Sequence, residues 1–124
     1  MNYLQRWEQY APKVYSAIRS NVNDVAAIAH NTGWSEFRIK RVKDHLFYRQ
    51  HQLDDRFDYF DPHPDIADAW LRLQQGNFNQ EDLRLLEHEY FESRFESIFH
   101  TNYRTAHEAT ERSGRVWSPP ITEE

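Results

Sequence analysis

Apolar side chains recur every three or four residues along most of this chain, which is the spacing of one face of an α-helix. The longest such run covers residues 79–100, where no Gly or Pro interrupts the pattern. Asn79 can cap its first turn, with Asp82 three residues further on as the partner in a capping box. The apolar positions predict one buried stripe, made of Leu83, Leu86, Tyr90, Phe91, Phe95, Ile98 and Phe99.

Shorter stretches with the same spacing predict further helices on both sides of this one. They cover residues 3–10, 12–20, 24–32, 36–49, 65–75 and 103–113. Pro12 separates the first two, because proline interrupts a helix interior. Residues 50–64 break the helical spacing, and two prolines there favour an extended or turning backbone. The pattern predicts an all-α fold, a compact bundle of about five to seven helices. We expect one domain over residues 1–114 and an extended tail over residues 115–124.

The N-terminal half has the pattern of a helix-turn-helix. Gly33 comes where the helix over residues 24–32 must end, and Ser35 can cap the helix that follows. In a DNA-binding protein that second helix would enter the major groove. The cations available for phosphate contacts are Arg38, Lys40, Arg41 and Lys43. Residues 36–49 therefore allow nucleic-acid binding, whereas a simple helical hairpin with the same pattern would only expose a solvated charged face.

Composition bounds the class of protein more than its function. The chain has 124 residues, which suffices for one compact domain. No apolar run approaches roughly 20 residues and the first residues lack the apolar segment of a signal peptide, so we expect no membrane span. The absence of cysteine excludes disulfides and thiolate metal ligands and fits a cytoplasmic location. The net charge of −5 argues against nonspecific nucleic-acid binding.

Candidate chemistry is concentrated in the long helix and the helix after it. His88 and Glu92 are one helical turn apart, and Glu89 lies beside them. A short turn near residue 101 would fold the last helix back along the long one, which would bring His107 toward Glu92. We therefore expect the rings of His88 and His107 to lie within about 8 Å of each other, close enough to share a ligand.

The segment over residues 50–64 offers further candidates. His51 and Asp54 would approach the long helix from this segment, whose aromatic side chains can hold it against the core. His45 precedes it and would join a cleft if the histidines converge. Convergence of titratable groups from three segments would mark a functional site. The candidate catalytic residues are His88, Glu89, Glu92, His107, His51 and Asp54.

Three interpretations of these residues remain open. In the first, His88, Glu92 and His107 bind a divalent metal ion of unknown identity and Glu89 is a general base, as in hydrolytic zinc sites. The chain lacks the two-histidine HExxH motif, because Glu92 takes the place of the second histidine. In the second, a histidine pair, or a histidine with a carboxylate, acts as acid and base without metal, as in small ribonucleases. In the third, each histidine only hydrogen-bonds a neighbour.

Several segments taken in order resemble a known kind of domain. These are KDHLFYRQHQLD, FDPHPDIADAWLRL, DLRLLEHEYFES and YRTAH. Together they resemble a poorly characterised helical domain found at the C-terminal ends of bacterial polymorphic toxins and in phage head-morphogenesis-like proteins. The resemblance covers about residues 24–110. The matching positions are His45, His51, Asp54, Trp70, His88, Glu89, Glu92 and His107.

The resemblance implies a hydrolase or nuclease and a protein partner of the immunity type. The competing class is a non-enzymatic binding module for DNA, through residues 36–49, or for a protein. A cleft that gathers the histidines would favour the enzyme. Scattered histidines, with the four cations of residues 36–49 on one exposed face, would favour the binding module.

Overall fold

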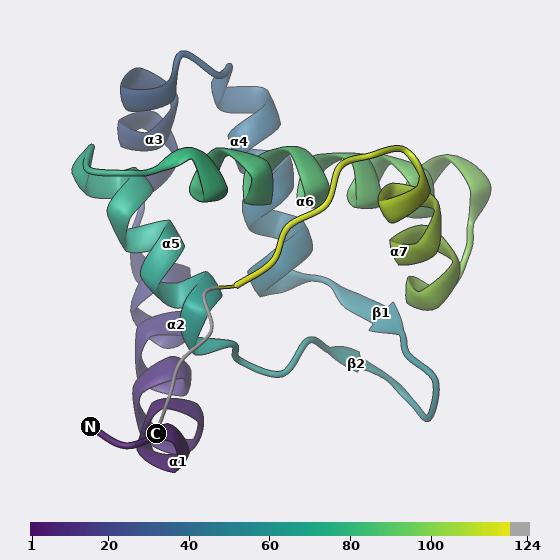
Figure 1. The fold of residues 1–124 in the computed structure, drawn as a ribbon, viewed down its shortest axis with the longest axis horizontal. Coiled ribbons are helices and arrows are strands. Elements are labelled where there is room, and N and C mark those ends of the chain that lie inside the picture. Colours follow the sequence, from purple (N-terminus) through teal and green to yellow (C-terminus); the bar gives the residue numbers. More distant parts are fainter. Residues whose placement is uncertain (120–124) are drawn as a thin grey trace.

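The computed structural model describes residues 1–119, and this part of the chain folds into six continuous helices and one short β-hairpin. Figure 1 shows α6 lying across the other helices, with α7 folded back beside it. Two of the six helices contain a π-helical turn, labelled η1 and η2. The elements are α1 (Tyr3–Gln5), η1 (Arg6–Tyr10), α2 (Ala11–Ser20), α3 (Asp24–Thr32), α4 (Glu36–Lys43), η2 (Asp44–Tyr48), β1 (Gln50–Gln52), β2 (Phe57–Tyr59), α5 (Pro64–Gln75), α6 (Gln80–Phe99) and α7 (Tyr103–Arg112). The predicted all-α fold is confirmed.

The predicted break at Pro12 is wrong. Elements α1, η1 and α2 form one continuous helix, and the π-helical turn η1 comes just before the proline. In that turn the N–H of Ala11 bonds to the carbonyl of Arg6, five residues back. The wider turn makes room for the proline ring, which would clash with the preceding turn of a regular helix.

Several local predictions about the helix ends are confirmed. Gly33 has a left-handed backbone (φ 81°) at the end of α3, and the hydroxyl of Ser35 accepts from the N–H of Arg38 at the start of α4. Asn79 and Asp82 form a reciprocal capping box on α6, with side-chain to backbone distances of 2.9 and 3.1 Å. The chain thus enters the site-bearing helix through a fixed turn.

Residues 50–64 contain structure that the sequence pattern did not predict. Strands β1 and β2 pair antiparallel, with His51 opposite Asp58. Because side chains alternate along a strand, His51 is buried while its neighbours on β1 are exposed. The hairpin therefore delivers one histidine to the interior.

The core lies where α2, α3, α4, η2, α5 and the first half of α6 meet. Trp70, Tyr15 and Phe47 are its largest fully buried side chains. The ring N–H of Trp70 donates to Asp24 (3.0 Å), which also binds the ammonium of Lys43 (2.7 Å). A buried ion pair thus lies inside the apolar core.

The predicted apolar stripe of α6 is correct only in its first half. Leu86 is fully buried, whereas Phe91 and Phe95 are half-buried, and Ile98 and Phe99 are 55% and 61% exposed. In the second half of α6 the buried face is polar and carries His88, Glu89, Glu92 and Ser93. The helix turns its aromatic face outward there because α7 and η2 cover the polar face.

The tail after α7 runs back over the molecule. Residues 115–119 contain no helix or strand, and the half-buried Trp117 packs edge-on against His63, with ring centres 5.8 Å apart. The remainder of the predicted tail, residues 120–124, lies outside the described residues. No helix within residues 1–119 is both long and apolar enough to cross a membrane.

Candidate functional site

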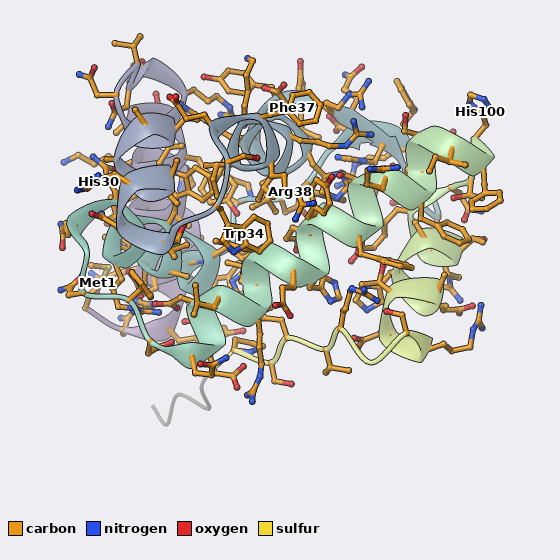
Figure 2. All side chains as sticks on the ribbon, turned by 90° about the horizontal axis from the view of Figure 1, so that it is seen from above. Met1, His30, Trp34, Phe37, Arg38 and His100 are labelled. Atoms are coloured by element: carbon orange, nitrogen blue, oxygen red, sulfur yellow. The ribbon has the colours of Figure 1, made fainter. Side chains whose placement is uncertain are left out.

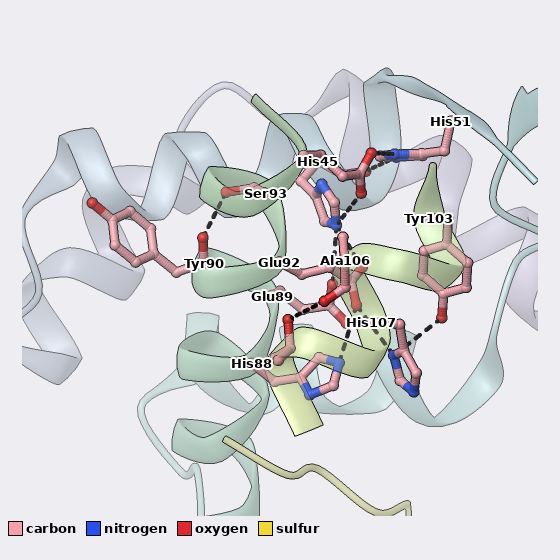
Figure 3. Close-up of polar contacts among 12 residues, drawn as sticks. His45, His51, His88, Glu89, Tyr90, Glu92, Ser93, Tyr103, Ala106 and His107 are labelled. Atoms are coloured by element: carbon pink, nitrogen blue, oxygen red, sulfur yellow. Dashed lines mark hydrogen bonds and ion pairs between the residues drawn. The ribbon is translucent and has the colours of Figure 1, made fainter. Parts of the chain in front are cut away.

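The buried polar face of α6 forms the centre of a histidine and carboxylate cluster (Figure 3). Glu92 is 1% exposed, and both of its oxygens contact histidine nitrogens. Oε1 is 2.8 Å from Nε2 of His45, which η2 carries, and Oε2 is 3.2 Å from Nδ1 of His107 on α7. The same Oε2 is 3.2 Å from Nε2 of His88, one turn earlier on α6. One carboxylate thus joins three histidines from three elements.

The rings of His88 and His107 lie 5.1 Å apart, well within the separation expected from the sequence. Their convergence follows from the short turn after α6, where His100 adopts a left-handed backbone (φ 53°) and ends the helix. Asn102 then caps α7 by accepting from the N–H of Thr105. The reversal packs α7 against α6 and brings His107 over Glu92.

His51 reaches the cluster from the hairpin. Its Nδ1 is 2.8 Å from Oε1 of Glu96, and its Nε2 donates to the backbone carbonyl of His45 (2.8 Å). The ring of Phe60 stacks on the ring of His51 at 3.9 Å, nearly parallel. Of the aromatic side chains in this segment, Phe60 thus holds it over the long helix as expected, whereas Phe57 and Tyr59 are 62% and 46% exposed.

Asp54 does not join the cluster. It lies in the turn between β1 and β2, where it is exposed and pairs with Arg104 of α7 (3.0 Å). The strand that turns His51 inward ends before Asp54, so nothing directs that carboxylate toward α6. The Arg104 guanidinium holds the pKa of Asp54 below its usual value by hydrogen bonding. Its role is to link the hairpin to α7.

Backbone carbonyls fix the orientation of two histidine rings. Nδ1 of His88 donates to the carbonyl of Arg115 in the tail (2.7 Å), which leaves Nε2 to face Glu92. Nε2 of His51 donates to the carbonyl of His45 in the same way and leaves Nδ1 to face Glu96. A histidine held by one nitrogen, so that its other nitrogen is oriented toward a fixed point, is typical of metal ligands. The oriented nitrogen can donate a proton to the carboxylate it faces, and it would present a lone pair only to a metal ion bound in place of that proton.

The pKa values of Glu92 and Glu89 are shifted in opposite directions. Burial would raise the pKa of Glu92, but hydrogen bonds from His107, His45 and His88 outweigh it and lower the pKa well below the usual value. Burial and the charges of Glu92 and Glu96 raise the pKa of Glu89 well above the usual value. The hydrogen bond to Glu92 raises the pKa of His107. Environments that push neighbouring pKa values apart are typical of acid and base assignments in active sites.

Two clefts reach the cluster from different sides. One has a volume of about 340 Å³ and is lined by His45, His51 and Glu96. The other has a volume of about 320 Å³ and ends on Glu89 and Glu92. Members of the cluster thus form part of the walls of both clefts.

Glu96 and His45 are the members of the cluster that were not among the candidate catalytic residues. Glu96 is four residues after Glu92 and seven after Glu89, so helical spacing places all three on one side of α6. That spacing was the available signal, but the sequence also allowed a solvated face. His45 gave no signal from spacing, because it comes from a different helix.

The four cations proposed to contact nucleic acid do not share one exposed surface. Lys43 is buried against Asp24, and Arg41 donates to Ser93 of α6 (3.1 Å). Arg38 lies over the ring of Tyr90 at 5.2 Å, beside α6 in Figure 2. Arg38 is nevertheless exposed, and Lys40 is 70% exposed and pairs with Asp44, one turn further on. Two of the four cations thus point inward, and nucleic-acid binding through residues 36–49 stays a prediction.

Three further histidines lie outside the cluster, namely His63, which caps α5, and the exposed His30 and His100. Figure 2 shows His30 and His100 at opposite ends of the molecule. Both are exposed and end helices, His30 in the last turn of α3 and His100 after α6. His100 lines the cleft beside His51, so His30 is the matched control for the histidines of the cluster.

No family model, curated protein or solved structure matches this chain. The resemblance to polymorphic-toxin and phage head-morphogenesis domains therefore stays a prediction, and any function must be argued from the cluster itself.

Proposed function

We propose that the protein is a metal-dependent hydrolase in which His88, Glu92 and His107 hold one divalent cation. The observation that carries the proposal is the contact of one buried carboxylate with two histidine nitrogens whose rings come from different helices. Glu92 stays ionised under these contacts, because its pKa is lowered. An ionised carboxylate and two imidazoles are the ligand set of many catalytic zinc sites.

The distances fit a shared ion. Ligands bound at about 2.0–2.2 Å in a tetrahedron lie roughly 3.4 Å from each other. Nε2 of His88 and Nδ1 of His107 are each 3.2 Å from Oε2 of Glu92, and all three atoms lie within 4.8 Å of one another. Three protein ligands leave one position of a tetrahedron for water or substrate. Bound there, the ion would supply a nucleophile by lowering the pKa of a water molecule.

Other residues of this chain supply the general base and the lining of the substrate cleft. Glu89 is the candidate general base, because it lies beside the three ligands, and burial together with the charges of Glu92 and Glu96 raises its pKa, so it takes up a proton more readily than an ordinary carboxylate. The hydroxyl of Tyr103 lies 3.5 Å from Nδ1 of His107 and lines the cleft that ends on Glu89. Aromatic side chains, among them Trp7 and Phe60, line the same cleft and would limit the access of water.

The test is hydrolysis of p-nitrophenyl esters by the full chain with and without divalent cations. We expect activity with Zn²⁺ or Mn²⁺, loss of activity in chelator, and loss with His107→Ala, whose side chain is partly exposed and whose removal leaves the core intact. His30→Ala is the matched control and should keep full activity. Activity that survives chelator but is lost with His107→Ala would instead favour the metal-free acid–base mechanism. If the loaded protein hydrolyses none of these esters and binds no cation, the proposal is wrong.

A further inference from the structure

Both oxygens of Glu92 contact histidine, and they do so on different sides. Oε2 faces His88 and His107, whereas Oε1 is 2.8 Å from Nε2 of His45. The same nitrogen of His45 is 3.4 Å from Oε2 of Glu89. A carboxylate with separate ligand sets on its two oxygens has the arrangement of a bridging ligand between two metal ions.

The nitrogen that His51 adds to this second set is oriented by the π-helical turn η2. In η2 the N–H of Arg49 bonds to the carbonyl of Asp44, five residues back, at 2.9 Å. A regular helix would direct that N–H to the carbonyl of His45. The carbonyl of His45 is therefore free to accept from Nε2 of His51, so Nδ1 of His51 faces Glu96. Single π turns inside helices are often found at functional sites for such reasons.

Three carboxylates surround one histidine nitrogen, and their oxygens are incompletely satisfied. Nε2 of His45 is 2.8 Å from Glu92, 3.4 Å from Glu89 and 3.8 Å from Glu96. One N–H can donate fully to only one of them. Within residues 1–119, no hydrogen bond reaches Oε2 of Glu89 or Oε2 of Glu96, although both atoms are buried. Glu89 is itself only 6% exposed. A cation at this position would satisfy both oxygens.

We propose that a second divalent cation binds between His45, His51 and Glu96, with Glu92 as the bridge to the first ion. When both ions are bound, Glu89 becomes a ligand of the second ion and no longer acts as the general base of the one-ion site. This inference rests on the proposed function, because the bridge requires the first ion beside Oε2 of Glu92. The ligand atoms of His45, His51 and Glu96 lie within 4.8 Å of one another, as do those of His45, Glu89 and Glu92. Two ions that share a ligand lie about 3.5–4 Å apart.

A paired centre points to phosphate esters as the substrate class. Two ions at that separation stabilise both the attacking and the leaving oxygen of a displacement at phosphorus. The cleft beside the second ion offers hydrogen-bond donors for an anionic group, including Arg49 and Ser97. The hydroxyl of Thr101 lines it too and is buried without a partner among the described residues. In the reaction a water oxygen bonds to phosphorus, the ester P–O bond breaks, and a proton from that water passes to the leaving alkoxide. The reaction is a hydrolysis and changes no oxidation state.

The test is metal stoichiometry of the full chain. After removal of metal by chelator, titration calorimetry and elemental analysis with Zn²⁺ or Mn²⁺ are expected to give two ions per chain. Glu96→Gln and His51→Ala should each reduce this to one, and so should His107→Ala, which removes a ligand of the first ion. Glu87→Gln, an exposed glutamate of the same helix, and His30→Ala are controls that should keep two ions. In the Mn²⁺ protein, two ions joined by one carboxylate should give an exchange-coupled electron paramagnetic resonance spectrum.

The outcomes separate this inference from the proposed function. One ion in the parent protein, lost with His107→Ala but kept by Glu96→Gln and His51→Ala, would overturn the second site and leave the proposed function standing. No bound ion would overturn both. If His51→Ala loses its helical circular dichroism because its stacking on Phe60 is gone, Glu96→Gln carries the test, since Gln keeps the shape of a side chain at the edge of a cleft.

The substrate class has its own test. The parent protein with two ions is expected to hydrolyse bis(p-nitrophenyl) phosphate, and Glu96→Gln should slow this reaction by at least about 100-fold. Glu87→Gln should leave the rate unchanged. Hydrolysis of p-nitrophenyl acetate without hydrolysis of the phosphate ester would rule out phosphate esters while the metal-dependent hydrolase remained.

Discussion

Replacing Lys43 by Met removes the cation of a buried ion pair and leaves its partner charge behind. The ammonium of Lys43 is 2.7 Å from Oδ1 of Asp24, and the two side chains are 7% and 1% exposed. It also donates to the carbonyl of Asn21 (2.8 Å). Removing one member of such a pair costs about 3–5 kcal/mol, because the remaining charge is buried without compensation. Met is chosen because it keeps most of the volume of the lysine stem.

The expected shift is large for a protein of this size. With an unfolding entropy of about 2.1 cal/mol/K per residue, each kcal/mol changes the melting temperature of a 124-residue chain by about 4 °C. Lys43→Met should therefore melt about 12–20 °C below the parent protein. Calorimetry or circular dichroism melting measures this directly.

The control uses the same substitution three residues earlier. The side chain of Lys40 is 70% exposed and lies 3.9 Å from Asp44, so Lys40→Met should change the stability by less than about 1 kcal/mol. Adding Asp24→Asn to Lys43→Met should recover part of the loss, because Asn removes the unpaired charge and its carbonyl can still accept from Trp70. If Lys43→Met and Lys40→Met have the same melting temperature, the argument that Lys43 stabilises the core is wrong. Lys43 would then again be a candidate for contact with nucleic acid.

Three further predictions concern the burial of two side chains of α6, the histidine that caps α5, and the left-handed backbone of Gly76. Leu86→Ala should lower the free energy of unfolding, measured in urea, by about 2–5 kcal/mol. Phe95→Ala should lower it by about 1 kcal/mol, because Phe95 is half-buried. Burial lowers the pKa of His63, whose Nδ1 accepts from the N–H of Asp65 at the start of α5. The folded state therefore binds that proton less readily than the unfolded state. Stability should fall as the pH drops below about 6.5, and His63→Asn should show a smaller fall in the same urea titrations. Gly76→Ala should lower the melting temperature, because φ is 83° there and a Cβ strains that conformation.

The sequence predicts local structure correctly where contacts between neighbouring residues determine that structure. The cap at Asn79, the left-handed turn at Gly33 and the helix over residues 79–100 depend on hydrogen bonds and side-chain spacing within a few residues. The close approach of His88 and His107 was predictable for the same reason, because one short turn sets the packing of α7 on α6. His45 could not be assigned in this way, since its contact with Glu92 spans 47 residues.

The outward face of α6 shows most clearly what side-chain spacing cannot predict. Apolar spacing alone assigned Phe95, Ile98 and Phe99 to the core, because burial of apolar surface is usually favourable. The structure instead buries Glu92 beside three histidines, whose hydrogen bonds compensate the burial of its charge. Sequence spacing determines which residues of a helix share a face. Only the tertiary structure decides which of two faces is covered, because that depends on the elements packed against the helix from elsewhere in the chain.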